Sequence, residues 1–240
     1  DCMAQNDPVA VIAGVGQGIG ARFVETFAQE GYRVVGLARN QHSLDDIQTA
    51  LGTLAERCKF WATDITDQAQ VDAVFARVRD ELGPVQLLIA NAGGGAKRGS
   101  FLDLSAQQFE RSLHGQAVGP FLCAKQAIPD MLAHGGGTVV YIGATSSVKG
   151  YAKSSGFAPG KFALRALAQC NAREFGPQGI HVFHVIIDGG IDSIPLGESR
   201  EVKSGMLDAR SIARVVAQAV AQPRDTWMHE FDIRPSLENF

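Results

Sequence analysis

Short apolar runs alternate with amphipathic helical patterns along nearly the whole chain, and this alternation limits the folds open to it. The run at 9–13 reads Val-Ala-Val-Ile-Ala and leads into glycines, as a strand buried on both faces does. Between the runs, apolar residues recur at helical spacing, most clearly over 67–82. This order predicts a doubly wound α/β fold, in which helices cover both faces of a parallel sheet. The seven strands are expected at 9–13, 33–37, 59–63, 85–90, 138–142, 181–187 and 230–234.

Composition narrows the class of protein. The chain has 240 residues, 45% of them hydrophobic, and a net charge of −3. With no internal linker or repeat, these values predict a single domain over residues 1–240, the first few of which we leave out of the fold. We expect no nucleic-acid partner and no membrane span, because the chain has no basic excess and no long apolar run. The cysteines form no CxxC pair, which favours a reducing, cytoplasmic location without a metal site.

A glycine-rich turn follows the first predicted strand and opens a predicted helix. It contains Gly14, Gly16, Gln17, Gly18, Ile19 and Gly20. Glycines let a backbone approach a pyrophosphate closely, and a helix N-terminus supplies N–H donors and a favourable dipole. The turn therefore predicts a dinucleotide site, with a glycine-rich turn that binds nothing as the alternative.

The end of the second predicted strand bears on the choice of cofactor. An acidic residue there would bind the ribose 2′-hydroxyl of NAD, but the chain has Ala38 followed by Arg39. A guanidinium can bind a 2′-phosphate through two hydrogen bonds, so we expect NADP(H) to be favoured over NAD(H). The alternative is an ordinary solvated arginine.

Two further segments extend this pattern into a family resemblance. Asp64-Ile65-Thr66-Asp67 follows the third strand, and Asn91-Ala92-Gly93 follows the fourth. With the GxxxGxG spacing of Gly14, Gly18 and Gly20, they make the chain similar to the short-chain dehydrogenase/reductase family over essentially its whole length. The resemblance implies a Rossmann-type domain in which Asp64 and Ile65 meet the adenine and Asn91, Ala92 and Gly93 support the sheet and the cofactor.

The same resemblance implies a catalytic set of asparagine, serine, tyrosine and lysine, and the chain keeps only part of it. Lys161 stands at the lysine position, but Phe157 replaces the tyrosine four residues earlier, and a phenyl ring cannot exchange a proton. Gln116 stands at the asparagine position. Two hydroxyls compete for the serine role: Ser147 by its SSxxG context and Thr145 by its spacing.

The segment after the sixth strand resembles a third family motif, which holds the nicotinamide carboxamide. Here Asp188 replaces a proline, and the resemblance implies that Gly189, Ile191 and Ser193 supply the contacts.

These residues predict an NADP(H)-dependent oxidoreductase with an atypical proton donor, acting on a small carbonyl, alcohol or activated double bond. Lys161, a water held by Gln116, Tyr151 or the substrate itself are the candidate donors. The alternative is a catalytically inactive protein that binds NADP(H) as a sensor or scaffold. Family members associate through the helices near 109–132 and 162–175, so we also expect a homodimer or homotetramer.

Overall fold

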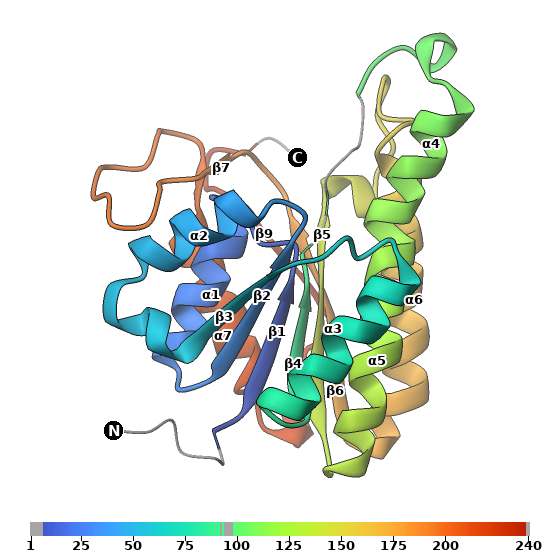
Figure 1. Ribbon diagram of the computed structural model, residues 1–240. Helices are drawn as coiled ribbons and strands as arrows, with labels where there is room; N and C mark the ends of the chain where they lie inside the picture. The colour runs from blue at the N-terminus through green and yellow to red at the C-terminus, as the bar shows by residue number, and fades with distance from the viewer. Residues whose placement is uncertain (1–6, 92, 94–97, 239–240) are drawn as a thin grey trace.

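A seven-stranded sheet forms the centre of the computed structural model, which describes residues 7–91, 93 and 98–238 (Figure 1). The strand order is β3-β2-β1-β4-β5-β6-β9, and every neighbouring pair is parallel. This arrangement confirms the predicted sheet. The strands are β1 (Val9–Ala13), β2 (Arg33–Ala38), β3 (Cys58–Ala62), β4 (Val85–Ala90), β5 (Gly137–Ala144), β6 (Ile180–Ile187) and β9 (Glu230–Ile233). A separate two-stranded pair joins β7 (Ile191–Asp192) to β8 (Leu207–Asp208).

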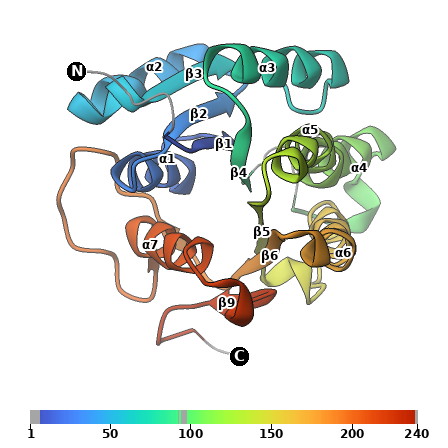
Figure 2. The ribbon, with the colours of Figure 1, turned by 90° about the horizontal axis from the view of Figure 1, so that it is seen from below.

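Helices cover both faces of the sheet (Figure 2). One face packs against α1, α2 and α7, and the opposite face packs against α3, α5 and α6. Because helices exclude water from both sides, all five residues of β1 are buried. The helices are α1 (Ile19–Gln29), α2 (Gln41–Ala50), α3 (Gln68–Glu81), α4 (Ala106–Leu113), α5 (Gly119–Ala133), α6 (Ala158–Phe175) and α7 (Ala209–Val220). Over the described residues, no helix combines the length and the hydropathy that crossing a membrane requires.

The long helical pattern expected near 109–132 is interrupted. It consists of α4, a π-helical turn at His114–Val118 and α5. Pro120 lies in the first turn of α5 and has no N–H to donate to the carbonyl of Gln116, so the regular hydrogen-bond pattern lacks one bond where the π-helical turn meets α5. The sequence pattern predicted the apolar face of this helical segment but not the π-helical turn within it.

The strand order creates the crevice of the fold. From β1 the chain crosses outward to β2 and β3, then returns to β4 on the other side of β1. The loops after β1 and β4 therefore leave the sheet in opposite directions, which opens a crevice at the carboxyl ends of these strands.

Candidate functional site

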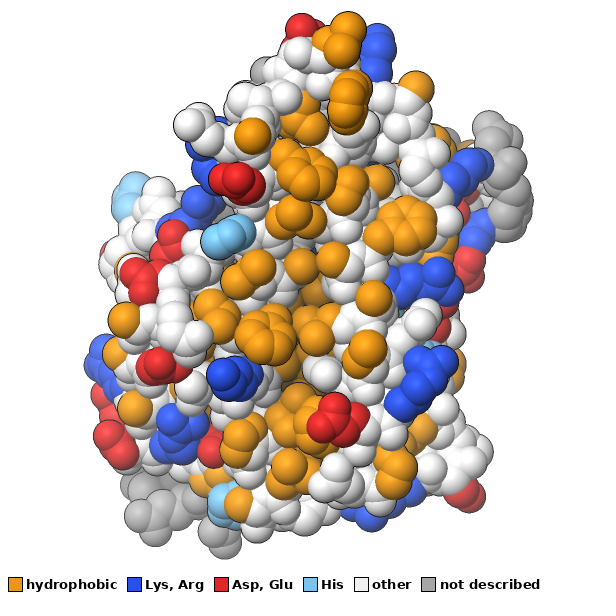
Figure 3. Space-filling model, turned by 90° about the vertical axis from the view of Figure 1, so that its right-hand side faces the viewer, with side chains coloured by type: hydrophobic (Ala, Val, Ile, Leu, Met, Phe, Trp, Pro, Cys, Tyr) orange, Lys and Arg blue, Asp and Glu red, His pale blue; other side chains and the backbone are white. Residues whose placement is uncertain are grey.

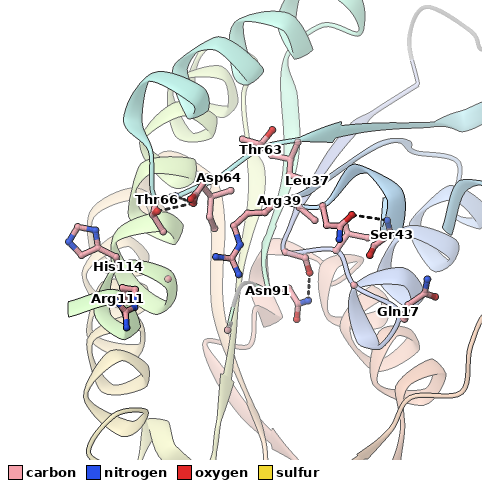
Figure 4. Close-up of a pocket in the computed structure, with 18 of the residues that line it drawn as sticks. Gln17, Leu37, Arg39, Ser43, Thr63, Asp64, Thr66, Asn91, Arg111 and His114 are labelled. Atoms are coloured by element: carbon pink, nitrogen blue, oxygen red, sulfur yellow. Dashed lines mark hydrogen bonds between the residues drawn. The ribbon is translucent and has the colours of Figure 1, made fainter. Parts of the chain in front are cut away.

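A cleft of about 770 Å³ opens at this crevice, between the ends of β1–β4 and one side of α4 (Figure 4). Many residues predicted to bind a cofactor line it, namely Gly14, Gly16, Gln17, Ala38, Arg39, Asp64, Ile65, Asn91 and Gly93. The structure thus brings residues as distant in the sequence as Gly14 and Gly93 together at this one cleft. Ala92 lies outside the described residues, and Gly189, Ile191 and Ser193 are not part of the lining. The turn residues Gly18, Ile19 and Gly20 lie directly behind the lining, at the start of α1.

The glycine turn is built from close backbone approaches. Gly14 has φ = 102°, a conformation that residues with side chains rarely adopt. A Cβ atom at Gly20 would lie 2.7 Å from the Gly14 carbonyl oxygen and 2.9 Å from the Cα of Val15. By contrast, a Cβ atom at Gly16 would have no neighbour within 4 Å. Gly14 and Gly20 are therefore needed for the shape of the turn, whereas Gly16 keeps its surface open.

Two polar side chains fix the neighbouring loops. Asn91 donates from its Nδ2 atom to the Gly14 carbonyl over 2.7 Å, which ties the end of β4 to the glycine turn. The Asp64 carboxylate accepts hydrogen bonds from the backbone N–H of Thr66 at 3.0 Å and from its hydroxyl at 2.8 Å. Asp64 thus holds the loop after β3 while it still borders the cleft.

Two exposed arginines stand on different walls of the cleft. Figure 4 shows Arg39 reaching from the end of β2 into the space between the walls, with Arg111 and His114 on the opposite side. Within the described part of the chain, neither guanidinium has an ion pair or hydrogen bond to another residue. Both charges are therefore free to meet an anion. Sequence reasoning found Arg39 but not the opposite wall, which α4 and the π-helical turn after it form with Gln107, Glu110, Arg111, His114 and Gly115.

Lys161 lies beyond the inner end of the cleft. Its side chain reaches from α6 to β5, where Nζ donates to the Ile142 carbonyl over 2.8 Å. A Cβ atom at Gly93 would lie 3.7 Å from Nζ, so the ammonium group adjoins the cleft lining. Only 5% of the residue is exposed, and this burial lowers the pKa of Lys161 to about 8.

Comparison with known proteins agrees with this geometry. A family model described as short chain dehydrogenase matches residues 8–201. The chain belongs to the short-chain dehydrogenase/reductase family. A short-chain dehydrogenase/reductase of Armillaria gallica is 32% identical over 177 residues, which cover 72% of this chain and 67% of that protein. A cis-4-hydroxycyclohexanecarboxylate dehydrogenase of Sinomonas cyclohexanicum is 29% identical, with 89% of this chain and 87% of that protein covered.

Solved structures share the fold of this short-chain dehydrogenase. A short-chain dehydrogenase from Rhodopseudomonas palustris matches with a TM-score of 0.82 at 28% identity, covering 95% of this chain and 98% of that one. A variant of actinorhodin polyketide ketoreductase, solved with NADPH, matches with a TM-score of 0.87 over the full length of both chains. At 20% identity, the second likeness supports the fold alone.

Phe157, which the sequence analysis assigned to the family's tyrosine position, has two cations near its ring. Phe157 is the residue before α6 and is half-buried. Its ring centroid lies 6.0 Å from the Lys161 Nζ atom and 5.2 Å from the central guanidinium carbon of Arg98. A cation near an aromatic face is attracted by the ring quadrupole. The Phe157 ring therefore lies near two cations, but it has no exchangeable proton.

The candidate hydroxyl and amide groups already have partners inside the protein. Ser147 is fully buried, and its Oγ accepts a hydrogen bond from the Ala144 N–H at 3.1 Å. Thr145 donates to an Asp188 carboxylate oxygen over 2.5 Å. Gln116 is also fully buried and donates to the Ser112 hydroxyl over 2.6 Å, although its Oε1 atom has no partner among the described residues. Like Phe157 and Lys161, these three residues lie outside the lining of the cleft.

The segment after β6 packs underneath the glycine turn. A Cβ atom at Gly18 would lie 2.7 Å from the Ser193 hydroxyl. The absence of a side chain at Gly18 therefore allows the segment after β6 to pack against the glycine turn. The Arg22 guanidinium of α1, which sequence reasoning missed, donates to the carbonyls of Ile194 and Pro195. Ile191 belongs to β7 and pairs with Leu207, while Gly189 lies against Pro235.

Asp192 anchors the same segment from its other side. Its buried carboxylate accepts two hydrogen bonds from Arg200, both 2.7 Å long, and one from the Lys203 N–H. The hydrogen bonds from Arg200 are the main reason that the pKa of Asp192 is well below its usual range. The negative charge of Asp192 is thus neutralised within the segment.

Proposed function

We propose that this short-chain dehydrogenase is an NADP(H)-dependent oxidoreductase for a small carbonyl, alcohol or activated double bond. The observation that carries the proposal is the buried ammonium of Lys161, placed beside Gly93 at the inner end of a cleft built on a glycine turn. The dehydrogenase and reductase names of the relatives add support. In this proposal, residues 1–240 form one dinucleotide-binding domain.

The residues of the cleft fit a nicotinamide dinucleotide. Gly14 and Gly20 allow the close turn that brings backbone N–H groups and the start of α1 to a pyrophosphate. Arg39 offers an unpaired cation for a 2′-phosphate, and Ala38 leaves the neighbouring position without the acid that would favour NAD. Asp64 and Ile65 border the adenine end in this assignment.

The chemistry is then divided between cofactor and protein. A bound nicotinamide supplies or accepts a hydride. Lys161 binds the nicotinamide ribose in this assignment, and it holds the proton that the substrate oxygen gains or loses. Burial lowers the pKa of Lys161 to about 8, which brings its ammonium group close to proton exchange at neutral pH.

A second function, cofactor binding without catalysis, is favoured by one observation. Phe157 has no exchangeable proton, and the Thr145 hydroxyl donates its hydrogen to Asp188. General acid–base catalysis typically contributes on the order of 10²–10⁴-fold, so the loss of the tyrosine alone lowers the rate greatly. A protein with this site binds NADP(H) and reports its level through a partner.

Two measurements separate these functions. Calorimetric titration with NADPH and NADH tests the cofactor, and we expect tighter binding of NADPH. Single-turnover mixing of the NADPH complex with a panel of ketones, imines and activated alkenes tests hydride transfer through the loss of NADPH absorbance. Turnover of any member supports the oxidoreductase. Tight NADPH binding with no turnover supports the sensor, and no binding of either nucleotide contradicts both.

We also propose that the protein assembles as a homodimer or homotetramer through α5 and α6. The face that carries these helices shows hydrophobic side chains gathered at its centre (Figure 3). Phe121 of α5 is 45% exposed and Phe162 of α6 is 43% exposed. Contiguous apolar surface of this kind is typical of an interface. A light-scattering mass near 25.6 kDa, the mass of one chain, would contradict the proposal.

A further inference from the structure

A buried serine joins the π-helical turn to the segment that leads into α6. Ser112 of α4 is buried, and its hydroxyl donates to the Gly156 carbonyl over 2.5 Å. The same oxygen accepts a hydrogen bond of 2.6 Å from the Nε2 atom of Gln116, four residues later. Residues at this spacing lie on one face of a helix, so one hydroxyl can reach both the glutamine amide and Gly156.

The two hydrogen bonds of the Ser112 hydroxyl fix which way the Gln116 amide faces. A carbonyl oxygen can only accept, so the Ser112 hydrogen must point at Gly156. The Ser112 oxygen is then an acceptor toward Gln116, and only the NH2 group of the amide can donate to it. The carbonyl oxygen Oε1 of Gln116 must therefore face away from Ser112.

Close packing against α6 holds the Gln116 amide in this orientation. A Cβ atom at Gly160 would lie 2.9 Å from the Cβ atom of Gln116 and 3.1 Å from its Nε2 atom. Because Gly160 has no side chain, the first turn of α6 packs directly against the glutamine. Oε1 is buried and has no hydrogen-bond partner among the described residues, so it remains available to accept from a water or a substrate.

The same hydroxyl anchors the residues that precede Lys161. Gly156 is followed by Phe157, whose carbonyl accepts the Lys161 N–H at 3.4 Å. Phe157 is the N-cap residue of α6, and its side chain makes no hydrogen bond to the helix. The hydrogen bond from Ser112 to Gly156 is therefore a tertiary anchor beside a helix start that has no side-chain cap of its own.

We propose that Ser112 is a positioning residue that acts through Gln116. Its hydroxyl fixes the amide so that Oε1, and not the NH2 group, is the atom left to meet a proton donor beside the first turn of α6. The inference rests on the proposed oxidoreductase function, because an oriented acceptor affects the reaction only if a proton moves there.

Proton NMR of the glutamine side-chain amides tests the orientation without any turnover. The Gln116 signal is identified by its loss in Gln116→Leu. We expect one Gln116 amide hydrogen to resonate downfield in the unmodified protein, because it is bonded to Ser112. Ser112→Ala should move this resonance upfield, toward the position of a glutamine amide without a hydrogen bond. Identical Gln116 signals in the unmodified protein and Ser112→Ala would overturn the proposal.

Ser154→Ala is the matched control for this measurement. Ser154 is also buried, and its hydroxyl makes two hydrogen bonds with the backbone of Tyr151. Its carbonyl accepts the N–H groups of Phe157 and Ala158, so Ser154 supports the same start of α6 without a hydrogen bond to Gln116. The control should leave the Gln116 signal in place. An equal shift in both serine variants would indicate a general loosening of the segment and would also overturn the proposal.

A double-mutant cycle tests the role of Ser112 in the reaction. We expect Ser112→Ala to lower the rate of hydride transfer about tenfold, as the loss of one ordinary hydrogen bond does, and to leave the Kd for NADPH unchanged. In the Gln116→Leu background, the same substitution should change the rate little, because the amide that Ser112 orients is absent. An equal loss in both backgrounds, or no loss in either, would overturn the proposal.

Two further outcomes keep the test decisive. Ser112→Cys retains a weak donor and should give a smaller loss of rate, so it replaces Ser112→Ala if that variant does not fold. Absence of turnover in the unmodified protein would contradict the proposed function, whereas the NMR shift would still decide whether Ser112 orients the Gln116 amide.

Discussion

The two ends of the site are built by different means. At the proposed nucleotide end, the backbone makes the shape: Gly14 adopts a positive φ, Gly20 leaves room for a carbonyl and Asn91 ties two loops together. At the proposed reaction end, side chains would supply the chemistry, and Lys161 stands beside the phenyl ring of Phe157. Backbone geometry requires particular glycines, so its loss would be visible in the sequence. A side-chain mechanism can be rearranged while the fold is kept.

Removal of the Lys161 amine is the strongest test of the reaction end. We expect Lys161→Met to lower hydride transfer on the order of 10²–10⁴-fold, because the ammonium group holds the transferred proton. Nucleotide affinity should fall much less, since most of the cleft is unchanged. Single-turnover absorbance and calorimetry measure the two effects. Equal losses of binding and turnover would contradict the division between the two ends.

The same variant also tests the burial of the charge. The folded protein releases the Lys161 proton near pH 8, whereas an unfolded lysine keeps it until about pH 10.5. Between these values the unfolded state binds more protons, so the stability of the unmodified protein should rise with pH relative to Lys161→Met. The difference amounts to roughly 3 kcal/mol across this range. Urea denaturation at pH 7.5 to 10.5, in steps of about one pH unit, measures the free energy of unfolding of both proteins. If the amine is solvated in the folded protein, the two plots of this free energy against pH should be parallel.

Charge reversal at Arg39 tests the cofactor choice at the nucleotide end. We expect Arg39→Asp to weaken NADPH binding about 100-fold, because two charge-assisted hydrogen bonds are lost and a carboxylate meets the 2′-phosphate. NADH binding should change little, and calorimetry measures both.

Arg111 on the opposite wall provides the matched control. Arg111→Asp introduces the same charge change into the cleft and should alter the ratio of the two affinities much less. If Arg111→Asp shifts that ratio and Arg39→Asp does not, the 2′-phosphate lies on the α4 side.

Two glycines of the turn provide a smaller but sharper comparison. Gly20→Ala places a methyl group 2.7 Å from the Gly14 carbonyl oxygen, so we expect a lower melting temperature and about tenfold weaker nucleotide binding. Gly16→Ala adds the same methyl group in open space and should leave the melting temperature of the nucleotide-free protein unchanged. Equal destabilisation by both variants would show that close approach is not what Gly20 permits.

Restoration of the phenol has the smallest expected effect. Phe157→Tyr adds a hydroxyl near Lys161, and we expect a gain of a few-fold in the turnover of ketones. The gain is limited because Ser147 is buried and Thr145 is bonded to Asp188. Phe162→Tyr, on the outer face of α6, is the control. No gain with any carbonyl, together with intact NADPH binding, would favour the sensor function.

The sequence alone determined where the strands lie along the chain and which turn carries the glycines of the proposed nucleotide site. Apolar runs record burial on both faces of a sheet, and the spacing of Gly14, Gly18 and Gly20 records a backbone shape, so both are local properties of the chain. The strand limits were recovered to within two residues for every member of the sheet. The break between α4 and α5 was missed, because Pro120 and Pro129 both lie within the same apolar pattern and neither specifies a π-helical turn.

Only the tertiary structure decided what surrounds each polar group. Arg111 and His114 belong to the cleft because α4 packs beside strands that lie far from it in the sequence. The absence of a side chain at Gly18 leaves room for Ser193, and the absence of one at Gly143 leaves room for His184. Both contacts join segments that lie far apart in the sequence. In the sequence, Ser147 was one of two hydroxyls that competed for the serine role. Burial and the partners of a side chain depend on packing between elements, which no local pattern records.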